Sequence, residues 1–154
     1  MMKILHKKLN KKGFTLAELL IVVAILAILV AVSIPIFTSK LEDARKATDE
    51  ANLRAAKALV ANAIITDDFP ASQWKKMGTD AYAANYDAEK GVLVPSDTTV
   101  KGYGQDSGIP GETNDKTVGN EYQAWATSMF CKKDSYLWVN YFPGTEKYYI
   151  IWTE

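Results

Sequence analysis

The chain has 154 residues, which is enough for one domain with a core or for a long helix joined to a small domain. Lys and Arg balance Asp and Glu at 18 each, but the first thirteen residues hold five lysines and no acid. The remainder has 13 basic and 18 acidic residues, a net charge of −5, which argues against a general nucleic-acid binder. A basic segment set apart in this way is typical of a targeting signal.

An apolar run follows the basic segment. Residues 19–39 carry no charge, and as a helix these 21 residues span about 31 Å, roughly one bilayer core. The preceding lysines favour a cytoplasmic N-terminus and an outward-facing remainder. A secretory signal peptide and an ordinary signal anchor are the alternatives, although A-V-S at residues 31–33 is a poor site for signal peptidase.

The residues directly before the apolar run form a distinctive pattern. Residues 12–19 read K-G-F-T-L-A-E-L, upstream of the place where an ordinary signal peptidase cuts. Glu18 is an ionisable group beside a membrane span, which is costly and by default indicates a function. Residues 8–40 resemble the class III signal of type IV prepilins and their relatives, although Ala17 stands where that family more often has Val.

The resemblance implies how the N-terminus is processed and what Glu18 does. Prepilin peptidase would cleave between Gly13 and Phe14, methylate the new amine of Phe14, and leave the apolar run in the mature protein. In a filament, a buried carboxylate without a partner is costly, so the amine of an incoming subunit would neutralise Glu18 of its neighbour and fix the axial register. The alternative is that Glu18 merely marks the end of the span.

Pro35 lies inside the helical pattern and predicts a kink, because proline removes a helical hydrogen bond. The family commonly has proline at this place, and its helix can unwind locally there in filaments. A glycine often stands upstream in the family, where this chain has Ala27.

Residues 40–66 change character and predict an amphipathic helix. Glu42 with Lys46 and Glu50 with Arg54 form pairs in the favourable i,i+4 order. A helix from Phe14 to about residue 65 is about 78 Å long, too long for a head of under 100 residues to bury. Its first half must therefore find lipid and then partner helices, and D-D-F-P at residues 67–70 ends it. The expected apolar stripe consists of Leu41, Ala44, Ala51, Ala55, Leu59 and Ala63.

The rest of the chain predicts a short helical region followed by strands. Residues 72–77 predict a short helix capped by Ser72, and residues 80–86 another helical turn or two. The segments 91–95 and 98–103 are candidate strands, residues 104–120 a long surface loop, and residues 122–132 a strand in preference to a helix. Residues 135–142 and 147–153 predict a β-hairpin across P-G-T-E.

An antiparallel sheet packed on the stem helix would complete an α+β pilin fold. Residues 86–93 and 100–105 resemble segments of pilins from Gram-positive bacteria, notably clostridia. The lack of paired cysteines is also similar to that group, because many Gram-negative pilins close a C-terminal loop with a disulfide.

Little in the sequence indicates catalysis or a cofactor. The one histidine, His6, lies in the segment predicted to be removed, so no histidine triad or histidine metal site is expected. Gly102-x-Gly104 lies in a loop context and does not indicate a phosphate site. Cys131 cannot form an intramolecular disulfide; it is a buried small residue, or else an intermolecular bridge or reactive thiol.

Two further surface roles stay open. Loop acids could bind calcium, as in some major pseudopilins, or could simply be solvated. The C-terminal tyrosines and tryptophans could form an adhesive surface, or could pack within the strands. The acids concerned are Asp97, Asp106, Glu112 and Asp115.

The sequence therefore predicts a structural subunit of a type IV pilus, with a leader at 1–13, a membrane and filament-core helix at 14–39, a stem at 40–66 and a head at 67–154. The resemblance implies prepilin peptidase, the assembly machinery and like subunits as partners, and a path from the cytoplasmic membrane to the cell surface for adhesion, motility or aggregation. The alternatives are a pseudopilin of a secretion or DNA-uptake machine and a membrane-anchored binding domain that never polymerises.

Overall fold

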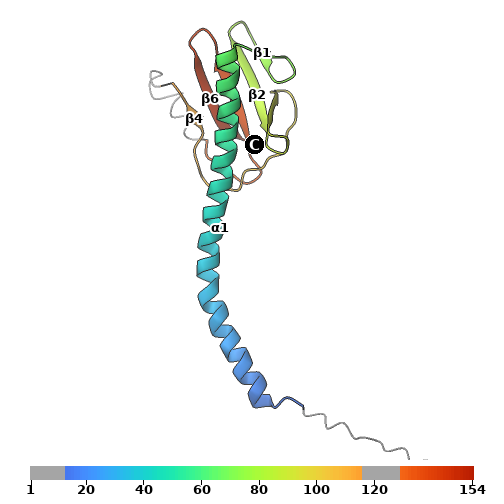
Figure 1. Cartoon of the computed structure of the whole chain (residues 1–154), viewed down its shortest axis with the longest axis vertical. Coiled ribbons are helices and arrows are strands. Elements are labelled where there is room, and N and C mark those ends of the chain that lie inside the picture. The colour runs from blue at the N-terminus through green and yellow to red at the C-terminus, as the bar shows by residue number, and fades with distance from the viewer. Residues whose placement is uncertain (1–12, 116–128) are drawn as a thin grey trace, which may run out of the picture. The chain divides into compact units, whose positions relative to one another are not determined.

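The computed structural model describes residues 13–115 and 129–154, and the chain divides into two units, Met1–Lys40 and Leu41–Glu154 (Figure 1). One helix, α1, continues from the first unit into the second, and the strands all belong to the second. This arrangement confirms the expected α+β fold of a long N-terminal helix followed by a small antiparallel sheet. The elements are α1 Leu16–Thr66, β1 Lys75–Met77, β2 Ala81–Asp87, β3 Val92–Pro95, β4 Glu112–Thr113, β5 Tyr136–Phe142 and β6 Lys147–Thr153.

Helix α1 ends where the sequence predicts. Asp67 adopts a left-handed backbone conformation with φ of 49°, and Pro70 follows shortly after. The amide of Asp67 donates to the carbonyl of Ile64 at 3.3 Å, and that of Asp68 donates to the carbonyl of Ala63 at 3.1 Å. These two bonds form a Schellman motif, which satisfies the last helical carbonyls and turns the chain toward the sheet.

The buried stripe of α1 differs from the predicted one. Leu41, Ala44 and Ala51 are exposed, whereas Ala55 and Leu59 are half-buried and Ala63 is buried. The packed face lies about one residue along the helix from the predicted stripe. The prediction counted apolar residues only and so left out Asp49, a polar residue of that face. The buried residues of the helix are Asp49, Ala56, Val60 and Ala63.

The predicted ion pairs of the stem are confirmed. Glu42 and Lys46 lie 3.8 Å apart, and Glu50 and Arg54 lie 2.7 Å apart. All four side chains are at least two-fifths exposed, so each pair contributes only a few tenths of a kcal/mol, about 0.3–0.5 in typical helices.

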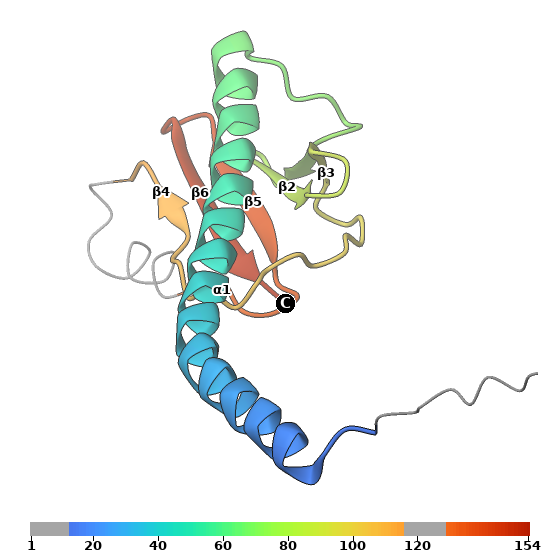
Figure 2. The ribbon, with the colours of Figure 1, turned by 60° about the horizontal axis from the view of Figure 1, so that its bottom comes forward.

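The sheet has the strand order β1-β2-β5-β6-β4, with β3 also paired to β2, and every pairing is antiparallel. The predicted hairpin is present: β5 and β6 pair from Tyr136 with Thr153 to Phe142 with Lys147. The stem part of α1 crosses one face of this sheet (Figure 2). The core between them includes Ala56, Val60, Ala84, Leu137, Val139 and Ile150.

The predicted helical turns at 72–77 and 80–86 are wrong. Residues 75–77 form the exposed edge strand β1, and residues 81–87 form β2, which is hydrogen-bonded on both sides. The alanines of β2 favour a helix locally, but Ala83 and Ala84 are fully buried on opposite faces of the sheet. Tertiary packing therefore overrides local propensity here.

The strand predictions elsewhere are partly confirmed. The candidate at 91–95 is β3, whereas the candidate at 98–103 is a loop. The predicted loop at 104–120 contains the two-residue strand β4. It also forms two isolated β-bridges, one between Gln105 and Lys133 and one between Pro110 and Phe130. Most of the strand predicted at 122–132 lies outside the described residues, and Cys131 and Lys132 are not in a strand.

Candidate functional site

The predicted cleavage bond lies directly before the helix. Gly13 and Phe14 have no regular structure, and α1 begins two residues after Phe14, at Leu16. The side chain of Phe14 is 87% exposed, and a Cβ added to Gly13 would meet nothing within 4 Å. Within the described part of the chain, no side chain shields the Gly13–Phe14 bond.

Glu18 is held by Thr15 in a capping box. The amide and the hydroxyl of Thr15 donate to Oε2 of Glu18, at 2.8 and 2.7 Å. The amide of Glu18 donates in return to Oγ1 of Thr15 at 3.2 Å. This reciprocal arrangement satisfies donors at the helix start and places the carboxylate at the positive end of the helix dipole.

The sequence analysis missed the role of Thr15, although the signal was present. The residues T-L-A-E at 15–18 match the T-x-x-E spacing of a capping box directly before an apolar run. Both hydrogen bonds to the carboxylate use Oε2, and Oε1 accepts none from the described residues. One oxygen of Glu18 is therefore open to a second donor.

The first half of α1 has an apolar surface that the described residues leave uncovered. Its large apolar side chains from Leu16 to Phe37 are between 49% and 79% exposed. Among the described residues, α1 is the one helix long and apolar enough to cross a membrane. Two hydroxyl side chains donate to backbone carbonyls of the same helix: Ser33 donates to the carbonyl of Leu29 at 2.7 Å, and Thr38 donates to that of Pro35 at 3.0 Å.

Pro35 lies within α1, which continues on both sides of it. The predicted kink there stays a prediction, as does the cleavage and methylation at Gly13 and Phe14. Gly13 and Phe14 are accessible in the structure.

Asp49 is the buried polar centre of the stem helix. It is fully buried, and both its oxygens accept the amide of Gln105 at 3.1 Å. The thiol of Cys131 donates to Oδ2 of Asp49 at 3.1 Å. Close packing here requires a glycine, since a Cβ at Gly104 would lie 2.2 Å from the carbonyl oxygen of Lys132. The carboxylate thus joins two loops of the head to the helix.

Cys131 is a buried packing residue in this fold. It is 1% exposed. Burial raises the pKa of its thiol, and the hydrogen bond to Asp49 raises that pKa further. The thiol is therefore held protonated, and a bridge to another chain would require the loop at Cys131 to open.

Three of the four loop acids proposed as calcium ligands, Asp97, Glu112 and Asp115, pair with lysines in separate places. Asp97 lies 2.8 Å from Lys75, and Glu112 forms an ion pair with Lys57. Among residues 13–115 and 129–154, no group of three His, Cys, Asp or Glu side chains is arranged to hold a metal ion.

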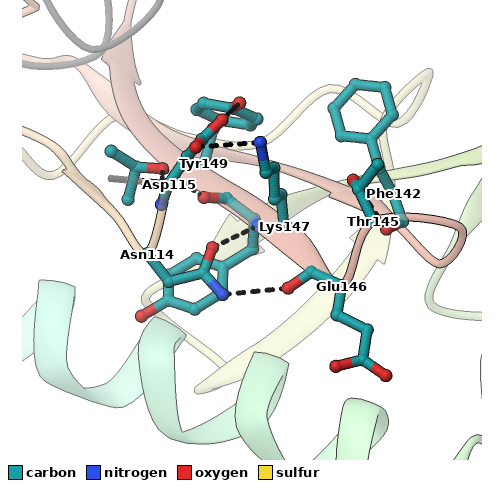
Figure 3. A network of polar contacts seen from close by, with 9 residues as sticks. Asn114, Asp115, Phe142, Thr145, Glu146, Lys147 and Tyr149 are labelled. Atoms are coloured by element: carbon teal, nitrogen blue, oxygen red, sulfur yellow. Dashed lines mark hydrogen bonds and ion pairs between the residues drawn. The ribbon is translucent and has the colours of Figure 1, made fainter. Parts of the chain in front are cut away.

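Asp115 belongs to a polar network that fastens the segment after β4 to the hairpin (Figure 3). It is 1% exposed, lies 3.0 Å from Nζ of Lys147, and accepts the hydroxyl of Tyr149 at 2.6 Å. Asn114 donates to the carbonyl of Glu146 at 2.9 Å and accepts the amide of Tyr148 at 2.8 Å. These contacts give Asp115 a structural role in the head.

Comparison with known proteins matches the N-terminal segment. The family model of the prokaryotic N-terminal methylation motif matches residues 8–34, and this motif is the class III signal peptide of type IV pilins. The match includes Gly13, Phe14 and Glu18. No curated protein and no solved structure matches the chain. The chain thus carries the signal of a prepilin-peptidase substrate of the pilin-like or pseudopilin kind.

Proposed function

We propose that this protein is the structural subunit of a type IV pilus. One observation carries the proposal: the methylation motif leads directly into a helix whose first half has apolar side chains that no described residue covers. Such a surface is stable in lipid, and outside a membrane it must be covered by other helices. Polymerisation through the first half of α1 supplies that cover.

In the proposed mechanism, the peptidase cuts the accessible bond between Gly13 and Phe14 and methylates the new amine. The cut leaves Phe14 one residue before Thr15, so the capping box remains intact. The charged amine of a neighbouring subunit then approaches Oε1 of Glu18. A carboxylate can accept both the internal bonds and this external one, because each of its oxygens has two lone pairs.

The test is intact-mass and N-terminal analysis of the protein from sheared cell-surface material. We expect a chain that begins with N-methylated Phe14 and is recovered in filaments. A processed chain that stays in the cell envelope would instead favour a pseudopilin. A chain that begins at Met1 or after Val32, found only in membranes or medium, would overturn the proposal in favour of an anchored or secreted domain.

A further inference from the structure

We draw no further inference here: the strongest candidate, the groove of about 340 Å³ on the head between residues 129–132 and the end of β6, where the side chain of Phe130 is 51% exposed, carries no proposal because nothing in the structure shows what covers it.

Discussion

At the residue scale, Glu18 has two tasks that one carboxylate can perform together. Oε2 caps the start of α1 through Thr15, and Oε1 remains open to a second subunit. The cap also places Phe14 just outside the helix, at the end where the proposed amine forms. Charge and capping can be separated experimentally, because a capping box accepts Gln in place of Glu.

Glu18→Gln should therefore keep processing and the helix start but lose assembly. An amide oxygen can still accept from Thr15, whereas it carries no charge for the amine of Phe14. We expect at least about a tenfold drop in filament yield, equivalent to about 1.4 kcal/mol per subunit added, measured by quantifying sheared filaments. Glu50→Gln, on the exposed face of the same helix, is the control. Normal assembly of Glu18→Gln would refute the proposed charge pairing.

Gly13→Ser should block processing while leaving the fold unchanged. A Cβ at Gly13 has no neighbour within 4 Å, so any effect arises in the peptidase and not in this chain. We expect most of the variant to remain as precursor, measured by intact mass. Gly144→Ser is a matched control, since Gly144 also has nothing within 4 Å of an added Cβ. If Gly13→Ser is processed like the wild type, the cleavage assignment is wrong.

At the element scale, the stem of α1 is held to the head by a polar contact as well as by apolar packing. The side chain of Asp49 is fully buried and accepts hydrogen bonds from the amide of Gln105 and the thiol of Cys131. Helical periodicity placed the packed face one residue away from its true position, because Asp49 belongs to that face. A pattern of apolar residues cannot reveal a buried carboxylate whose partners lie 56 and 82 residues away.

Asp49→Ala should destabilise the head by about 1–3 kcal/mol, because it removes the acceptor of the Gln105 amide and of the buried Cys131 thiol. The measurement is the midpoint of urea unfolding of the full chain in detergent, followed by tryptophan fluorescence. Glu50→Ala, one position along the helix, removes only an exposed ion pair and should cost less than about 0.5 kcal/mol. Equal effects of the two substitutions would show that the Asp49 contacts contribute nothing beyond a surface charge.

At the scale of the whole molecule, the two units differ in what they bury. Every buried residue of α1 lies beyond Lys40, in the unit that also contains the sheet. The described residues of the first unit are all exposed, and its large side chains are mostly apolar. One unit thus has its own core, and the other requires a membrane or partner helices.

Removal of residues 1–40 should therefore give a water-soluble monomer that unfolds cooperatively. The retained residues contain the whole described core, whereas the described residues among those removed are all exposed and their large side chains are mostly apolar. Size-exclusion chromatography without detergent and thermal unfolding by circular dichroism measure both properties. Aggregation of the truncated chain, or a gradual transition, would show that the head depends on residues 1–40 for its fold.

The sequence by itself determined the prepilin signal, the length and end of α1, the ion pairs of the stem and the C-terminal hairpin. Each of these depends on neighbours close in the chain: a cleavage motif, a run of apolar residues, an i,i+4 spacing or a turn. The capping box of Thr15 and Glu18 is also a local feature, because the T-x-x-E spacing at residues 15–18 indicates it.

Only the tertiary structure decided the rest. The alanine-rich residues of β2 form a strand because strands on both sides bury them, although their local propensity favours a helix. The burial of Asp49 against Cys131 likewise joins segments far apart in the chain. Local propensities are small beside the free energy of packing, so such features follow from the assembled core and not from any short stretch of sequence.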